Sequence, residues 1–407
     1  MRIIMASRES DWRREAENSI LLKSVSHWRE RPDRWFRGSY DRLPETVRVN
    51  PMSEEKDWVE SWLSSIGANR IPWFSGPGSA WEMPFERGSA EEEVKSLMSA
   101  LHETGRITRQ EAVSMLPVLA LDPTPGQIIL DLCASPGSKT TQICEHLGDS
   151  GAVVANEVIS GRVNTLVTNV QRHASRTVLV VQHDGRHIPR VPGSGFDGVL
   201  VDVPCTGSGT TRKNPDVWGK WRPSSGRSLH SLQYDLLTRA IELTKPGGRV
   251  VYSTCSLDPI ENEAVVARVL AGGKVRVVPR GDSLSGVPSN PGMTNWPLLN
   301  DKGELDNESK SEEYLIPTKD MAVSSQLNEC LRVWNDEIGG GGFFLAVLER
   351  ILEDDVSGVI NPFMSQKTID DPESFPQPID DQRERELREV WGSVPSNMWS
   401  RGKSLLW

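Results

Sequence analysis

The chain has 407 residues, 37% of them hydrophobic and 25% charged, with a formal net charge of −10. This composition is typical of a globular protein with more than one domain, and five cysteines without a CxxC pair indicate reduced thiols and argue against a metal site. No apolar run reaches the roughly 18 residues of a transmembrane helix, and the N-terminus lacks the apolar core of a secretory signal, so we expect a cytoplasmic protein, or a nuclear one in a eukaryote, without membrane contact.

The negative charge is unevenly distributed. Residues 351–407 hold eleven Asp and Glu against six Lys and Arg, which accounts for half of the net charge. The other 350 residues are therefore close to neutral on average. Local basic surfaces that bind nucleic acid are compatible with such a chain.

Residues 1–40 are expected to form a helical segment in which basic side chains alternate with aromatic ones. Two interpretations are open for this segment. Basic and aromatic side chains together can bind nucleic acid by pairing and stacking, or the aromatic side chains pack on the protein and leave the charges in solvent.

Residues 41–120 are expected to form a small α+β module. The alternating segment Leu43–Asn50 predicts a strand, and the Gly-, Pro- and Trp-rich segment Pro72–Pro84 predicts an irregular loop. Thr108 and Glu111 have the spacing of a capping box, which predicts that a helix begins before the apolar run that follows them.

Residues 121–350 alternate between strands and helices, which predicts a doubly wound parallel sheet with right-handed crossovers, an α/β fold. The predicted strands are Ile128–Leu132, Ala152–Glu157, Val178–Gln182, Gly198–Asp202 and Arg249–Ser253. The predicted helices are Ser138–Leu147, Gly161–Arg172, Ser228–Thr244 and Glu261–Leu270. A late strand, Phe343–Leu348, is expected to close the sheet edge in the antiparallel direction.

Residues 351–407 break this pattern. They are acidic and contain several prolines, with one short helix expected around Asp380–Trp391. We expect a tail or a peripheral cover here rather than a third folded domain.

The first strand of the predicted sheet leads into a turn that is typical of nucleotide-like cofactor sites. Gly137 lets the backbone bend sharply, and the N–H groups of the helix that follows point back toward the strand end. Glu157 closes the second strand and is placed to hold a ribose diol, while Asp184 follows the third strand and can pair with an adenine amino group.

Two cysteines follow the last two parallel strands. Cys205 lies in the loop after Asp202, and Cys255 lies in the loop after the fifth strand. Because neighbouring parallel strands end at the same sheet edge, both thiols are expected to face the cleft beside the Gly137 turn. Cysteines with structural roles usually lie inside strands or helices, so this pair indicates chemistry.

Methylation of C5 of a pyrimidine is a reaction that needs two thiols and an acid beside an adenosyl cofactor. C5 of cytosine is a poor nucleophile, and addition of a thiolate to C6 turns the ring into an enamine that accepts a methyl group. Asp202 is placed to supply an acid near N3, and Lys139 can favour a thiolate or orient Asp202.

Three segments resemble the Sun-type RNA (cytosine-5) methyltransferases: Asp131–Gln142, Asp202–Trp218 and Tyr252–Ala264. Further segments resemble the tRNA-modifying branch of that family, namely Arg109–Met115, the Arg212-Lys-Asn run and Gly292–Trp296. The likeness extends from about Leu43 to Arg350, and several long motifs occur in the family's order. It implies a Rossmann-like methyltransferase sheet over residues 121–350, preceded by an RNA-binding module.

The resemblance also implies roles for individual residues. Cys255 would be the nucleophile, Cys205 would assist product release, and Asp202 and Lys139 would support catalysis. The S-adenosylmethionine site would be lined by Cys133, Ala134, Ser135, Pro136, Gly137, Ser138, Lys139, Glu157, Asp184 and Asp202. Arg212 and Lys213 would lie on a basic flank suited to RNA phosphates. We expect a monomer that acts on RNA, with tRNA as the first candidate.

Several alternatives remain open. The two thiols could exchange roles, because DNA cytosine-5 methyltransferases use the thiol of a Pro-Cys motif as nucleophile. The substrate could be rRNA, or the chain could be an RNA-binding or assembly factor that keeps the fold without turnover. A methyltransferase acting on an exocyclic amine is a further alternative, although it would need no thiol.

Overall fold

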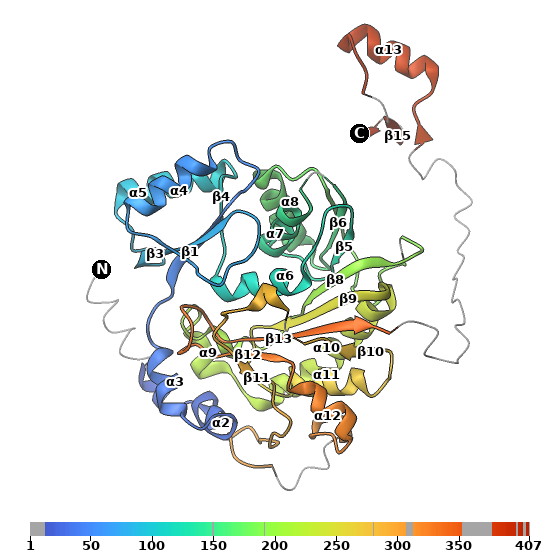
Figure 1. Ribbon diagram of the computed structural model, residues 1–407. Coiled ribbons are helices and arrows are strands. Elements are labelled where there is room, and N and C mark those ends of the chain that lie inside the picture. Colours follow the sequence, from blue (N-terminus) through green and yellow to red (C-terminus); the bar gives the residue numbers. More distant parts are fainter. Residues whose placement is uncertain are drawn as a thin grey trace. The chain divides into compact units, whose positions relative to one another are not determined.

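The apolar runs of the sequence form strands of one large sheet in the computed structural model of the protein (Figure 1). The structure describes residues 13–148, 150–190, 192–279, 281–306, 312–351, 377–395, 398–401 and 404–406. One compact unit of the chain ends near residue 355, and a second unit covers the remainder.

The first unit begins with helices α2 (Ile20–Trp28) and α3 (Pro32–Gly38). Trp28 and Trp35 are buried against Trp218 and Trp221 in one aromatic cluster. Trp28 and Trp35 therefore follow the second interpretation of residues 1–40, in which the aromatic side chains pack on the protein. Trp12 lies outside the described residues.

A four-stranded antiparallel sheet follows, in the order β2-β3-β1-β4. Its elements are β1 (Pro44–Val49), α4 (Lys56–Ser65), β2 (Asn69–Arg70), β3 (Ser79–Glu86), α5 (Glu92–Glu103) and β4 (Ile107–Arg109). The loop predicted over Pro72–Pro84 is partly wrong, because β3 begins at Ser79 and pairs with β1. The capping box is also wrong: Thr108 lies in β4, and the short helix at Ala112–Met115 has no side-chain cap.

The second sheet has the strand order β11-β12-β13-β9-β8-β5-β6-β7, with β10 also paired to β13. Its strands are β5 (Ile128–Asp131), β6 (Ala152–Asn156), β7 (Val178–Val181), β8 (Phe196–Asp202), β9 (Thr244–Thr254), β10 (Val275–Val277), β11 (Asn290–Pro291), β12 (Leu331–Val333) and β13 (Phe343–Arg350). Helix α6 (Leu116–Leu121) precedes these strands, and the helices between them are α7 (Ser138–Leu147), α8 (Ser160–His173), α9 (Asp216–Lys220), α10 (Pro223–Leu243), α11 (Glu263–Leu270) and α12 (Met321–Leu327).

Strands β5 to β9 pair in parallel, which confirms the predicted doubly wound α/β sheet. Successive residues point to opposite faces: Leu130 packs in the core with α10 and α11, while Ile129 packs with α6 and α7. Burial on both faces explains why these strands are continuous apolar runs in the sequence. Strand β13 is antiparallel to β9 as predicted, but β12 pairs with its other side, so β13 is not the sheet edge.

In the second unit, helix α13 (Asp381–Trp391) confirms the short helix predicted near residue 380, and Asp380 caps it by accepting from the N–H of Arg383 at 2.8 Å. Three short strands, β14 (Gln377–Pro378), β15 (Trp399–Arg401) and β16 (Ser404–Leu406), pair in one sheet that the sequence did not predict. Residues 352–376 of the predicted tail lie outside the described residues.

A buried ion pair joins the four-stranded sheet to helix α7. The guanidinium of Arg48 on β1 is fully buried and lies 2.8 Å from the carboxylate of Glu145 on α7, and it also donates to the carbonyl of Ser138 at 3.1 Å. His173 on α8 contacts the same carboxylate at 3.0 Å. Burial alone would raise the pKa of Glu145, but the Arg48 charge and the His173 hydrogen bond hold it below its ordinary value. The module therefore contacts the first residue of α7 directly.

We expect Arg48→Met to destabilise the protein by about 3–5 kcal/mol, because it leaves the Glu145 carboxylate buried without its main counterion. Chemical denaturation measures the loss. Arg106→Met is the matched control, because Arg106 belongs to the same module and pairs with Glu55 at the surface. The control should lose about 1 kcal/mol or less. Equal losses in the two variants would contradict a special role for the buried pair.

Candidate active site

The predicted site residues lie where the parallel strands end. The turn Cys133–Ser138 follows β5, Glu157 follows β6, Asp184 follows β7, Asp202 ends β8, and Cys255 follows β9. Because these strands are parallel and adjacent, all five positions belong to the carboxyl edge of one sheet.

The two predicted thiols are in contact. The Sγ atoms of Cys205 and Cys255 lie 3.3 Å apart, and both cysteines are free and half-buried. The hydrogen bond with Cys255, together with burial, raises the pKa of Cys205 well above its ordinary value. The two sulfurs are within hydrogen-bonding contact, and either thiol can be the donor.

Lys139 and Asp202 form an ion pair at this edge. Lys139 Nζ lies 2.7 Å from Asp202 Oδ2, and Ser253 Oγ donates to Asp202 Oδ1 at 2.8 Å. Burial alone would lower the pKa of Lys139, but the Asp202 carboxylate outweighs it and raises that pKa overall. Lys139 thus remains an ammonium group within a cavity that Cys255 also lines.

The turn before α7 requires a glycine. Gly137 has a φ of +108°, and a Cβ there would lie 2.9 Å from Leu166 Cδ1. Neighbouring side chains hold the turn: Asn169 donates to the carbonyl of Pro136 at 2.6 Å, and Arg162 donates to the carbonyl of Ser135 at 2.8 Å. The N–H groups of the first turn of α7 remain directed at the sheet edge.

Glu157 and Asp184 each have an arginine partner. Glu157 is buried, accepts from the N–H of Ile159 at 2.9 Å and lies 3.2 Å from Arg162. Asp184 pairs with Arg186 at 2.6 Å, which lowers the pKa of Asp184 to about 2. Both side chains are carboxylates at the sheet edge, and they can accept the hydrogen bonds that a ribose diol and an adenine amino group donate.

Asp131 ends β5 at the same edge, and the sequence indicated it only as the first residue of the segment Asp131–Gln142. Its carboxyl group is buried and accepts from Thr140 Oγ1 at 2.7 Å through Oδ2, while Oδ1 has no hydrogen-bond partner among the described residues. Burial raises the pKa of Asp131 to about 7. The feature of the sequence that could have identified Asp131 is an acidic residue at the end of an apolar strand. An orphaned acceptor under the Gly137 turn fits a site built for a cationic ligand such as a sulfonium cofactor.

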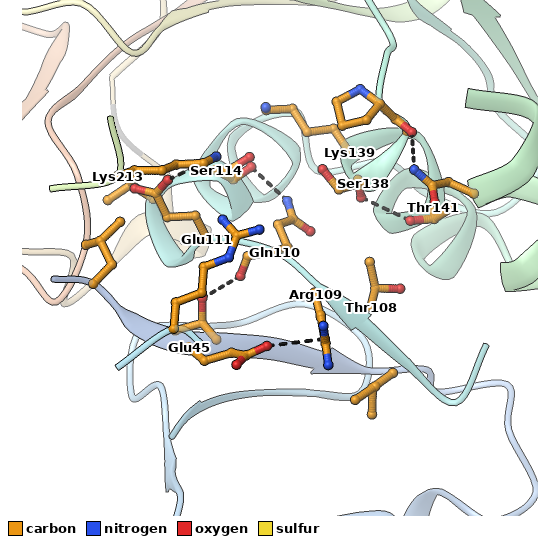
Figure 2. A pocket seen from close by; sticks show the side chains of 18 of the residues that line it. Glu45, Thr108, Arg109, Gln110, Glu111, Ser114, Ser138, Lys139, Thr141 and Lys213 are labelled. Carbon is orange, nitrogen blue, oxygen red and sulfur yellow. Dashed lines mark hydrogen bonds and ion pairs between the residues drawn. The ribbon is translucent and has the colours of Figure 1, made fainter. Parts of the chain in front are cut away.

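A cavity of about 540 Å³ runs between the two sheets (Figure 2). Cys255, Lys139 and Asp202 line it together with basic side chains from β4, from helix α8 and from two loops, namely Arg109, Arg172, Arg87 and Lys213. Cys205, Glu157 and Asp184 do not line it, so the cavity reaches Cys255 but not these two carboxylates.

The two predicted RNA contacts differ in their surroundings. Lys213 is half-exposed in the cavity, 3.9 Å from Glu111 (Figure 2). Arg212 instead donates to backbone carbonyls, including those of Asp41 at 2.8 Å and Gly340 at 3.2 Å. Its donors are used within the chain, which favours a structural role for Arg212 over the predicted contact with RNA.

Across the described residues, no helix has both the length and the apolarity to cross a bilayer. The same residues contain no group of three or more His, Cys, Asp or Glu arranged to hold a metal ion.

The parallel sheet with its glycine turn and carboxyl-edge acids defines a Rossmann-like methyltransferase fold. The model of the family described as 16S rRNA methyltransferase RsmB/F matches residues 118–349, and the chain belongs to this Sun-type family. A solved structure of a methyltransferase homolog protein from Pyrococcus horikoshii is 28% identical, covers 81% of this chain and 93% of its own, and has a TM-score of 0.61.

Two curated relatives are similar over most of the chain. A multisite-specific tRNA:(cytosine-C(5))-methyltransferase of Saccharomyces cerevisiae is 41% identical over 61% of this chain. A tRNA (cytosine(34)-C(5))-methyltransferase of Drosophila melanogaster is 38% identical over 71% of it. The chain spans only 39% and 43% of the length of these two proteins.

We expect the stability of the protein to fall as the pH rises through the range in which Asp131 titrates. Its pKa is 3.8 ordinarily and about 7 in the folded state, so between these values the folded state binds more protons than the unfolded state. The contribution of Asp131 to stability is therefore largest below about pH 4 and is lost as the pH rises to about 7. Asp131→Asn removes the titration.

Denaturation of both proteins at several pH values tests this. The free energy of unfolding of the wild type, relative to Asp131→Asn, should fall by about 2–3 kcal/mol from pH 5 to pH 7.5 and then level off. Parallel curves for the two proteins would show that the buried carboxyl group titrates normally.

Proposed function

We propose that this chain transfers a methyl group from S-adenosylmethionine to C5 of cytosine in RNA, with tRNA as its substrate. The observation that carries the proposal is the contact of two free thiols, 3.3 Å apart, beside the Lys139–Asp202 pair and the Gly137 turn. The family match and the names of the two curated relatives support the same reaction.

The cofactor would be held by the turn from Cys133 to Lys139 and by the carboxylates of Glu157, Asp184 and Asp202. When bound, S-adenosylmethionine supplies an electrophilic methyl group. The glycine turn, the N–H groups of α7 and the three acids at neighbouring strand ends support this placement.

Cys255 is the proposed nucleophile. Its thiolate adds to C6 of the cytosine, the sulfur–carbon bond forms, and the electron pair of the C5–C6 double bond becomes available at C5. N3 takes up a proton that Lys139 and Asp202 hold between them at 2.7 Å. C5 would then bond to the methyl group that the cofactor supplies, while the bond between that carbon and the cofactor's sulfur breaks and leaves S-adenosylhomocysteine, so that the base carries both the methyl group and the thioether to Cys255.

Release reverses the addition. C5 loses its proton to a base, the C5–C6 double bond forms again, and the bond between C6 and the sulfur breaks so that its electron pair returns to Cys255. N3 gives its proton back to the Lys139–Asp202 pair, which leaves a neutral base. The thiol of Cys205, in contact with that sulfur, stabilises the departing thiolate by donating a hydrogen bond.

Geometry supports this order of the two thiols. Cys255 lines the cavity together with Lys139 and Asp202, whereas Cys205 does not. A base that enters the cavity therefore meets the sulfur of Cys255 first.

The cavity supports an RNA substrate despite the net charge of −10. Its lining has five cationic side chains, Arg87, Arg109, Lys139, Arg172 and Lys213, against three carboxylates, Glu45, Glu111 and Asp202. A groove with excess positive charge attracts a phosphate backbone. Cytosine C5 and C6 are reached most easily in an extruded or single-stranded base.

The competing functions differ in what they require. An RNA-binding factor without turnover needs neither the thiol contact nor the Lys139–Asp202 pair, and methylation of an exocyclic amine needs no thiol. The family description keeps rRNA as the second candidate substrate. Methyl transfer from labelled cofactor to purified tRNA and rRNA, compared in parallel, distinguishes these functions. Five free cysteines are consistent with a cytoplasmic enzyme, which we propose to be a monomer.

We expect Cys255→Ser to abolish both methyl transfer and the covalent RNA adduct, because no nucleophile reaches C6. Cys205→Ser should instead accumulate the adduct, because release is slowed. A denaturing gel of enzyme incubated with RNA and cofactor shows the adduct as a shifted band. An adduct formed by the Cys255 variant and not by the Cys205 variant would exchange the two roles.

We expect Lys213→Ala to weaken RNA binding several-fold and to reduce the slope of log affinity against log salt by about one, the value for one lost phosphate contact. Lys220→Ala is the matched control, since Lys220 is exposed and pairs with Asp216 outside the cavity. Filter binding across a salt series measures both quantities. A slope unchanged from the wild type would remove Lys213 from the RNA site.

A further inference from the structure

A single buried carboxylate links the residues that immediately follow the two cysteines. Glu261 lies between β9 and α11 and is completely buried. Its Oε2 accepts from the N–H of Thr206 at 2.8 Å, and its Oε1 accepts from the hydroxyl of Ser256 at 2.5 Å and from the hydroxyl of Thr206. One side chain thus holds the loop of Cys205 and the loop of Cys255.

Neighbouring side chains fix this carboxylate in place. Gln233 on α10 donates to Glu261 Oε2 at 3.0 Å and to the carbonyl of Pro204 at 2.9 Å. Trp221 donates through Nε1 to the hydroxyl of Thr206 at 3.0 Å. The backbone on both sides of Cys205 is therefore held by groups that meet at Glu261.

The loop of Cys255 is held from the same point. The hydroxyl of Ser256, bonded to Glu261, also accepts from the N–H of Asp258 at 3.1 Å and lies 3.0 Å from the hydroxyl of Ser208. Ser208 belongs to the Cys205 loop, so the two loops also meet beyond the carboxylate. A buried, fully engaged carboxylate of this kind has little freedom to move.

We propose that Glu261 is a positioning residue, which acts by holding the two thiol loops so that the sulfurs of Cys205 and Cys255 stay in contact. The proposal rests on the proposed function for the use of that contact in product release. It does not require Glu261 to touch cofactor or RNA. The charge of Glu261 also contributes to the raised pKa of Cys205, after the hydrogen bond to Cys255, burial and the charge of Cys255.

The thiol contact can be measured without the reaction by using phenylarsine oxide. Its trivalent arsenic condenses with two neighbouring thiols, forming two arsenic–sulfur bonds and releasing water, and it binds single thiols weakly. The full-length wild type should bind it tightly across Cys205 and Cys255. Cys205→Ser should lose this binding, which identifies the pair among the five cysteines.

We expect Glu261→Ala to weaken arsenical binding at least tenfold and to lower kcat by a similar factor, with the KM for S-adenosylmethionine unchanged. Glu261→Gln keeps an oxygen acceptor and should restore part of both losses. Glu242→Gln is the control for the loss of a charge, since Glu242 is exposed and pairs with Arg239. Wild-type arsenical affinity in a folded Glu261→Ala protein would overturn the proposal.

A second pair of variants covers the case in which Glu261→Ala does not fold. Thr206→Val removes the hydroxyl that donates to the Glu261 carboxylate and should weaken arsenical binding about threefold. Thr206→Ser keeps that hydroxyl and should bind the arsenical as the wild type does. Equal affinity of the Val and Ser variants would also overturn the proposal. If the wild type transfers no methyl group to RNA but these affinities change as stated, the proposed function fails and the role of Glu261 stands.

Discussion

The parallel pairing of β8 with β9 is the constraint on which the site depends. Its register places Asp202 opposite Ser253, so the two loops leave the sheet side by side. Backbone hydrogen bonds continue the pairing beyond the strands, from Val203 N–H to the Ser253 carbonyl at 3.1 Å and from Gly209 N–H to the Cys255 carbonyl at 2.9 Å. Two free thiols fifty residues apart in sequence thereby come into contact.

The N-terminal module contributes to this edge through its contacts with α7. Arg48 bonds both Glu145 and the carbonyl of Ser138, the residue that follows Gly137. Asn169 holds the Pro136 carbonyl on the other side of the glycine and is itself bonded to Arg172. Arg172 lines the same cavity as Arg109 of the module. Residues that line the proposed RNA cleft are therefore in direct contact with residues that hold the proposed cofactor turn.

The sequence predicts secondary structure well where burial determines the pattern of apolar residues. It predicts poorly where contacts between residues far apart in the chain determine the structure. Strands covered on both faces are apolar runs, which is why β5 to β9 could be located. Strand β3 was missed because glycine and proline precede it and its strand character depends on pairing with β1. Arg212 was predicted to contact RNA because the sequence does not reveal its carbonyl partners, Asp41 and Gly340, which are distant from it along the chain. Glu261 appeared in the sequence only as the start of a predicted helix and as part of the segment Tyr252–Ala264, because the partners that define its role lie on two loops and a helix.

Two identical side chains at contact distance acquire different chemistry from their surroundings. Both sulfurs cannot be thiolates at 3.3 Å, because two like charges at that distance repel strongly, so the pair shares protons as a unit. Cys255 lines the cavity together with Lys139 and Asp202, whereas Cys205 does not line it and is followed by Thr206, whose N–H is bonded to the buried Glu261. This difference in position gives a geometric reason for proposing Cys255 as the nucleophile, beside the family resemblance.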